Sequence, residues 1–107
     1  MNATLTALAE PNRFQIVELL SRGPLGVGAI AQELRLRQPQ ASKHLRVLSE
    51  AGLVEVQPIA QQRIYRLRPE PFRELDSWLE SYRRLWEDRM DRFEDVLQEL
   101  QEKEKTT

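Results

Sequence analysis

The sequence of 107 residues contains no cysteine and a single histidine, His44. The lack of cysteine excludes disulfides, thiolate metal sites, iron–sulfur clusters and a cysteine nucleophile. One histidine is too few for a typical zinc site, which needs three or four ligands. The sequence also shows no nucleophile–base pair and no glycine-rich phosphate loop. We therefore expect neither an enzyme nor a bound metal or cofactor.

Long apolar runs are missing as well. No run approaches the ~18 residues that a membrane-spanning helix needs, and no charged segment followed by an apolar one opens the sequence. We expect a cytoplasmic protein without membrane contact. Glycine and proline are absent from the last 36 residues, although four glycines and six prolines punctuate the sequence before them. One uninterrupted helix is therefore predicted over residues 71–103.

The formal net charge of −1 argues at first against nucleic-acid binding, because nucleic-acid-binding domains are usually basic. The charges are, however, unevenly distributed along the chain. Residues 1–70 carry nine basic and six acidic side chains, a net charge of +3, whereas residues 71–107 carry seven basic and eleven acidic ones, a net charge of −4. Residues 35–68 alone reach +5. The N-terminal part is thus a candidate for binding a polyanion.

Apolar residues in residues 1–52 recur with the period of a helix and are interrupted at glycine and proline. Short helices are predicted over residues 3–8 and 27–34, and a longer one begins at Pro11 and ends before Gly23. Its apolar stripe includes Phe14, Ile16, Val17, Leu19 and Leu20. A fourth helix is predicted over residues 38–51, with Ala41, Leu45 and Leu48 facing inward. The three residues between the last two helices match a helix-turn-helix.

After Gly52 the pattern changes to that of strands. Residues 53–59 are β-branched and apolar, residues 63–68 alternate, and Ala60, Gln61 and Gln62 form the turn between them. A hairpin after a helix-turn-helix is a wing. The predicted fold is therefore mainly α with a β-hairpin wing, a winged helix-turn-helix. Residues 1–70 form the DNA-binding region and residues 71–107 a long dimerisation helix, within one compact domain in total.

The long helix carries a seven-residue pattern over four heptads. Phe72, Leu79, Trp86, Phe93 and Leu100 recur every seven residues, with Leu75, Tyr82 and Val96 three residues after three of them and Arg89 in the remaining position. The helix would span ~50 Å, whereas a domain of this size has a radius of gyration of ~13 Å. We expect residues 72–79 to pack on the chain's own first helix and the rest to pair with a second chain. A ligand pocket at Trp78, Tyr82 and Trp86 is the alternative.

The helix over residues 38–51 exposes polar side chains opposite its apolar stripe. An α-helix fits the major groove of DNA, where Gln recognises adenine, Arg and Lys recognise guanine, and Ser binds either base. Arg and Lys also bind phosphates. In the hairpin, Arg66 and Arg68 share one face, while Tyr65 and Leu67 share the other. The predicted DNA contacts are Gln38, Gln40, Ser42, Lys43, His44, Arg46, Arg63, Arg66 and Arg68.

These residues resemble the ArsR/SmtB family of dimeric winged-helix transcription regulators. The resemblance covers about residues 3–68 and is carried by residues 8–13, 27–31, 38–48, 50–54 and 63–67, with a Ser-x-His-Leu-x-x-Leu core at residues 42–48. It implies that Ser42 and His44 face DNA, and that the first and last helices form the dimer interface. The implied interface residues are Leu5, Leu8, Leu79, Tyr82, Trp86, Phe93, Val96 and Leu100.

The sequence departs from this family's metal sensors, which carry paired cysteines on the third helix or Asp, His and Glu ligands on the last. Neither set is present. Arg37 stands where relatives often have a Ser or Thr cap. We therefore expect a homodimeric repressor of a palindromic operator, without a metal site and with the identity of any small-molecule effector open. The alternative is a protein-interaction module in which the heptad helix recruits another protein and DNA binding is incidental.

Overall fold

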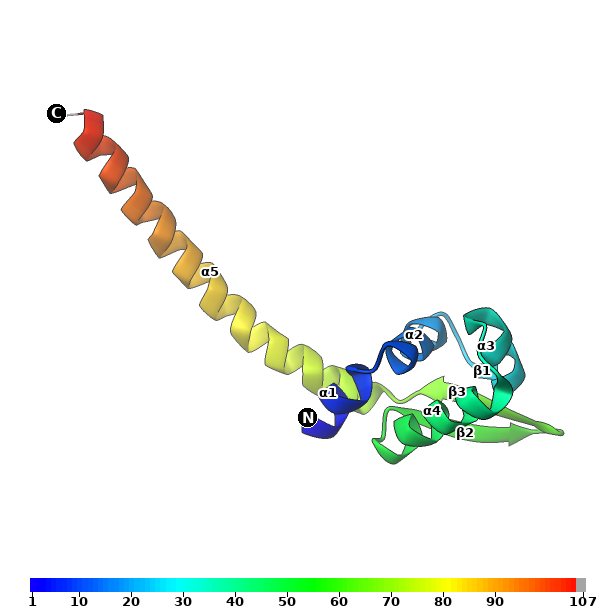
Figure 1. Ribbon diagram of the computed structural model, residues 1–107. Helices are drawn as coiled ribbons and strands as arrows, with labels where there is room; N and C mark the ends of the chain where they lie inside the picture. The colour runs from blue at the N-terminus through cyan, green and yellow to red at the C-terminus, as the bar shows by residue number, and fades with distance from the viewer. Residues whose placement is uncertain (106–107) are drawn as a thin grey trace. The chain divides into compact units, whose positions relative to one another are not determined.

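The computed structural model describes residues 1–105 (Figure 1). The helices are α1 (Asn2–Leu8), α2 (Pro11–Leu20), α3 (Val27–Leu34), α4 (Gln38–Glu50) and α5 (Pro69–Lys105), and the strands are β1 (Leu25–Gly26), β2 (Val54–Ile59) and β3 (Gln62–Leu67). The chain divides into two compact units, Met1–Glu74 and a second one that begins at Leu75. The predicted fold class, mainly α with a hairpin wing, is confirmed.

The core of the first unit is built from α2, α3, α4 and the hairpin. Its largest fully buried side chains are Ile16, Ile30, Leu45, Leu48 and Leu53. The inward stripe predicted for α4 is confirmed, because Ala41, Leu45 and Leu48 are all buried. This burial fixes which side of α4 remains open to solvent.

One prediction about the apolar residues of the N-terminal helices needs correction. Phe14 is 48% exposed, because the buried arc of α2 is defined by Ile16, Val17 and Leu20 and Phe14 lies on the far side of Val17 from the other two. In α1 the buried residues are Thr4 and Ala7, whereas Leu5 is exposed. Both α1 and α2 therefore present an apolar side chain to solvent.

The turn between α3 and α4 is held by backbone geometry. Arg35 has φ of 56°, a left-handed conformation, and the amide of Leu36 donates to the carbonyl of Ala31 at 2.9 Å. These features form the helix-ending turn usually made by glycine. Arg37 is the N-cap residue that precedes α4, and its side chain cannot accept a hydrogen bond. Instead, the Arg37 amide donates to Oε1 of Gln40 at 3.2 Å, which is half of a capping box.

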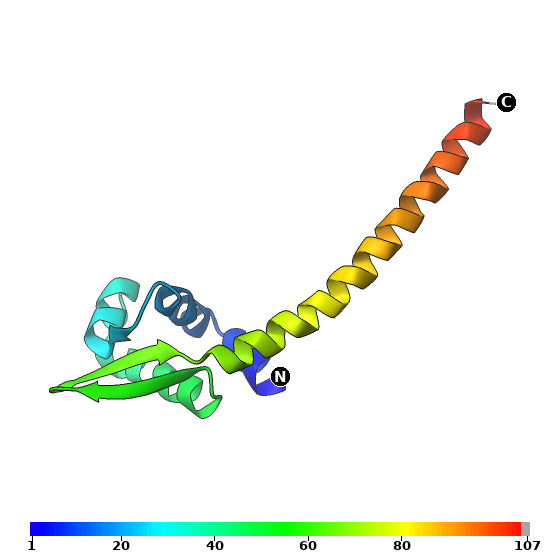
Figure 2. The same cartoon turned by 180° about the vertical axis from the view of Figure 1, so that it is seen from behind.

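The sheet is three-stranded and antiparallel, in the order β1–β3–β2. Leu25 pairs with Tyr65 and Gly26 with Ile64, so that the short strand β1 extends the hairpin. The sequence did not predict β1, because two residues carry no period. Ile59 pairs with Gln62, which shortens the turn from the three predicted residues to two, Ala60 and Gln61. Figures 1 and 2 show α4 beside the hairpin.

Helix α5 begins two residues earlier than predicted and is continuous over 37 residues. Phe72 is half-buried and packs against the core. Farther along the helix, Leu79 is 47% exposed. None of the described residues of α5 is fully buried. In residues 1–105, no helix combines the length and the apolar character that crossing a membrane requires.

Candidate nucleic-acid interface

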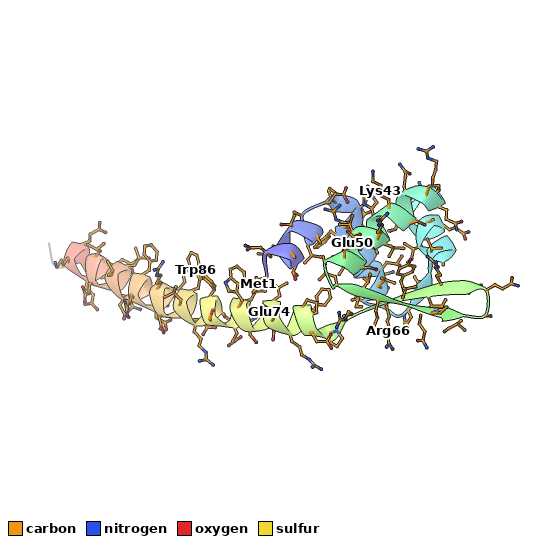
Figure 3. All side chains as sticks on the ribbon, turned by 90° about the horizontal axis from the view of Figure 1, so that it is seen from below. Met1, Lys43, Glu50, Arg66, Glu74 and Trp86 are labelled. Carbon is orange, nitrogen blue, oxygen red and sulfur yellow. The ribbon has the colours of Figure 1, made fainter. Side chains whose placement is uncertain are left out.

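The open side of α4 carries most of the side chains that the sequence predicted for DNA contact. Gln38, Gln40, Ser42, Lys43 and Arg46 are all exposed. Lys43 extends away from the hairpin in Figure 3 and has no ion pair within residues 1–105. The helix therefore presents amide, hydroxyl and ammonium groups from one side, a combination that can bind base edges and phosphates.

Arg46 and Gln40 have partners within α4 itself. The Nε of Arg46 donates to Oε1 of Glu50 at 3.2 Å, and both side chains are largely exposed. An exposed pair of this spacing contributes ~0.3–0.5 kcal/mol, so that another anion can displace Glu50 at little cost. Gln40 accepts the Arg37 amide, as described above. Its side-chain NH₂ group has no hydrogen-bond partner within residues 1–105.

His44 lies at the border of the open side and is half-buried. Its Nδ1 atom is 3.7 Å from Oε2 of Glu10, and its side chain is 20% exposed. Glu10 also caps α2, because Oε2 accepts from the Arg13 amide at 2.9 Å. The Arg13 side chain in turn donates through Nε to the carbonyl of Ala7, at 2.8 Å. His44 thus connects the outer helix α4 to the corner between α1 and α2.

The three hairpin arginines do not share one face. The register pairs Glu55 with Arg66 and Pro58 with Arg63. Successive side chains of a strand alternate in direction, which puts Arg63 on the same side as buried Tyr65. Arg66 lies on the other side, and Arg68, one residue past the end of β3, is expected there by the same alternation. Figure 3 shows Lys43 and Arg66 pointing to opposite sides of the first unit. The charge of +5 predicted for residues 35–68 is therefore divided between two faces.

The two arginines on the outer face of the hairpin have carboxylate neighbours. Nε of Arg66 donates to Oε1 of Glu55 at 2.6 Å. Nε of Arg68 lies 3.8 Å from Oε2 of Glu70. Arg63 has no ion pair within residues 1–105. Arg63 is therefore the hairpin arginine whose charge is least compensated.

A cleft of about 480 Å³ lies between the tip of the hairpin and the first turn of α3. It is lined by Gly26, Val27, Gly28, Ala29, Gln38, Gln61, Gln62 and Arg63. Arg63 from the hairpin and Gln38 from the start of α4 thus border one hollow. From the sequence, Gln61 and Gln62 are predicted only as turn residues, and the backbone at the start of α3 carries no signal of a cleft.

Carboxylates and the single histidine do not gather into a metal site. Within residues 1–105, no group of three or more His, Cys, Asp or Glu side chains is arranged to hold a metal ion. The Glu10–His44 pair is isolated in this respect.

The helices α3 and α4, joined by a three-residue turn and followed by the β2–β3 hairpin, define a winged helix-turn-helix. A family model described as a helix-turn-helix domain matches residues 8–57. A crystal structure of an ArsR family transcriptional regulator, RHA00566, is 31% identical with a TM-score of 0.70, covering 80% of this chain and 89% of that one. The chain belongs to the ArsR family of transcriptional regulators.

Other relatives agree with this assignment. The HTH-type transcriptional regulator Rv2034 of Mycobacterium tuberculosis is 46% identical over 59% of this chain. A biofilm growth-associated repressor of Agrobacterium fabrum is 41% identical over the same share. The matches span 59% and 54% of the length of these two curated relatives. A homodimeric winged helix-turn-helix DNA-binding domain from Mycobacterium bovis is 31% identical with a TM-score of 0.65, covering 76% of this chain and 75% of that one.

Proposed function

We propose that this chain is a cytoplasmic, homodimeric repressor that binds a palindromic operator with α4 in the major groove. The observation that carries the proposal is the open side of α4, where Gln40, Ser42 and Lys43 are exposed opposite a fully buried stripe. Two relatives support it by their descriptions, one as a repressor and one as a homodimeric DNA-binding domain. Bound to a promoter, such a dimer blocks transcription by occupying the DNA.

The open side of α4 offers a distinct chemistry at each position. The Gln40 amide suits the paired donor and acceptor of adenine, and Lys43 and Arg46 suit the acceptors of guanine. Ser42 bonds either base or a phosphate. Gln40 gives up its bond to the Arg37 amide, 3.2 Å long and exposed, if its oxygen is to accept from a base. In a symmetric dimer, two such helices enter successive major grooves roughly 34 Å apart.

In the wing, we assign DNA contact to Arg63 and not to Arg66 or Arg68. Arg63 borders the same cleft as Gln38 at the start of α4, so that a duplex lying along α4 brings its backbone toward this side of the hairpin. Arg66 and Arg68 lie on the opposite face beside Glu55 and Glu70. The narrowed set of DNA contacts comprises Gln38, Gln40, Ser42, Lys43, Arg46 and Arg63, with His44 as a positioning residue through Glu10.

A comparison of Arg63→Ala with Arg66→Ala tests this assignment. We expect Arg63→Ala to weaken operator binding by about 5–30-fold and to lower the slope of log K against log salt by about 0.9, because one phosphate contact is lost. Arg66→Ala removes the same charge from the other face and should change affinity by less than about twofold. Fluorescence anisotropy titrations at three salt concentrations measure the dissociation constant and the salt slope of each variant. Equal losses for both variants would contradict the assignment.

The dimer is supported by large apolar side chains that are exposed on α1 and α5. Leu5 of α1 is 40% exposed, while Leu8 is half-buried and packs against the core. In α5, the rings of Trp78 and Tyr82 meet edge to face at 4.9 Å, and Trp86 projects from the helix with 60% exposure (Figure 3). Because this aromatic group is open to solvent, we assign it to the dimer interface and not to an effector pocket.

The decisive experiment is a gel-shift titration of the full chain against the DNA upstream of its own gene. A specific regulator should bind one segment with Kd of ~10⁻⁸ M or tighter at physiological salt. Non-specific binding lies at ~10⁻⁴–10⁻⁶ M. Micromolar binding that is indifferent to sequence would refute the proposed function. Footprinting of the shifted complex should then reveal a site with two-fold symmetry.

A further inference from the structure

The apolar residues of α5 recur every eleven residues over residues 75–100, and all of them except Leu75 are large exposed side chains. They fall into five groups, and within each group the positions are eleven residues apart. The groups are Leu75, Trp86 and Leu97; Trp78, Arg89 and Leu100; Leu79 and Met90; Tyr82 and Phe93; Leu85 and Val96. Within residues 75–100 only Arg89 breaks the apolar pattern, which ends at Gln101 and Glu104. The seven-residue pattern predicted from the sequence includes Arg89 and leaves out Met90 and Leu97, although both are large exposed apolar side chains. We call the set repeated every eleven residues the eleven-residue face.

The two patterns imply different helix geometries. Eleven residues fill three turns at 3.67 residues per turn, close to the 3.6 of an undistorted α-helix. Seven residues fill two turns at 3.5, and a straight helix drifts by ~20° per heptad from that repeat. A straight helix drifts by a similar ~20° per eleven residues in the opposite sense, so that the eleven-residue face stays near the axis of a straight helix or winds slightly to the right. A seven-residue seam stays in contact only if two helices coil around each other to the left.

We propose that a second copy of this chain covers the eleven-residue face, and that the paired helices pack without a left-handed supercoil. This inference rests on the homodimer of the proposed function and specifies which residues it buries. The described part of α5 carries ten large apolar side chains that are 41–60% exposed. At roughly 80 Å² each, they would bury about 800 Å² per copy, the area of a standard stable interface.

Arg89 has a defined place in this arrangement. It shares a line along the helix with Trp78 and Leu100, within the covered face. A guanidinium in an apolar interface needs a carboxylate partner or a path to water. Arg89 has no ion pair within residues 1–105. The acidic side chains of the second copy's α5, which outnumber the basic ones, supply that partner.

Val96 and Leu97 distinguish the two patterns. They are adjacent, and each pattern places a different one of them nearer the middle of the covered face. In the seven-residue seam Val96 is central and Leu97 lies at the edge. In the eleven-residue face Leu97 shares the line of Leu75 and Trp86, and Val96 lies at the border with Leu85. Val96→Asp and Leu97→Asp introduce the same charge one residue apart, so that their effects on net charge and on the helix are closely matched.

Sedimentation equilibrium of the full chain measures the dimer dissociation constant of each variant. We expect Leu97→Asp to raise the dimer dissociation constant at least 100-fold and Val96→Asp to raise it less than about tenfold. Arg84→Asp, on the opposite side of α5, should leave the dimer dissociation constant unchanged. Circular dichroism checks that all variants stay helical. A reversed order or equal effects would overturn the eleven-residue face while leaving the dimer intact. A monomeric wild-type chain would refute both the proposed homodimer and this inference.

Discussion

Replacing Trp86 with Asp is expected to convert the dimer into monomers and to abolish tight operator binding. Trp86 is the most exposed of the large apolar side chains of the described chain, at 60%. Removing a buried tryptophan costs ~3–5 kcal/mol, and leaving a carboxylate in an apolar interface adds to that cost. Since each 1.4 kcal/mol is a factor of ten, the dimer dissociation constant should rise at least 100-fold.

The loss of DNA binding follows from geometry and not from any contact of Trp86 with DNA. A monomer carries one α4 and can occupy one half-site, so that the gain from linking two half-sites disappears. Sedimentation equilibrium and gel shift on the same preparations test both effects. Arg84→Asp, at a side chain that is 80% exposed, is the matched control. A Trp86→Asp variant that remains dimeric at micromolar concentration would remove this residue from the interface.

Replacing Lys43 with Ala is expected to weaken operator binding by about 1–3 kcal/mol, or roughly 5–150-fold, if the ammonium contacts a guanine. Lys43 is exposed on the open side of α4 and is not held by an intramolecular ion pair within residues 1–105. Its substitution is therefore expected to remove a DNA contact without disturbing the fold. Anisotropy titrations against the operator and against an unrelated duplex separate base recognition from phosphate binding.

Lys105→Ala serves as the control for Lys43→Ala, because it removes the same positive charge but lies in the second unit. A base contact predicts a loss on the operator that exceeds the loss on the unrelated duplex. Equal losses on both duplexes would assign Lys43 to a phosphate. An unchanged affinity on the operator would make Lys43 a solvated charge without a role in binding.

The helices could be predicted from the sequence because proline and glycine mark their ends and apolar residues mark their buried sides. Phe14 shows the limit of that reasoning. An apolar residue within a helical stripe is assumed to be buried, yet α2 buries only the arc defined by Ile16, Val17 and Leu20. Strand β1 could not be predicted, since its pairing with Tyr65 and Ile64 joins residues some forty positions apart.

The exposure of the candidate contact residues was predictable on α4, whereas their partners on the hairpin were not. Helical periodicity alone separates Lys43 and Arg46 from the buried stripe. Alternation along β3 separates Arg66 from the buried Tyr65. The partners of these side chains depend on register, however, and the two-residue turn decides that Glu55 meets Arg66. The contact between His44 and Glu10 joins two helices 34 positions apart and leaves no mark in the sequence.

The open edge of the wing has a consequence for the behaviour of this protein at high concentration. Strand β2 is an outer strand of the sheet, and Val56 and Ile59 on it are exposed. An edge strand with apolar side chains can recruit strands from other molecules and start aggregation. Pro58 interrupts this edge, because proline has no amide hydrogen to donate to an added strand. At the other edge, β1 offers only two residues. The wing can therefore expose apolar side chains and still resist the growth of intermolecular sheets.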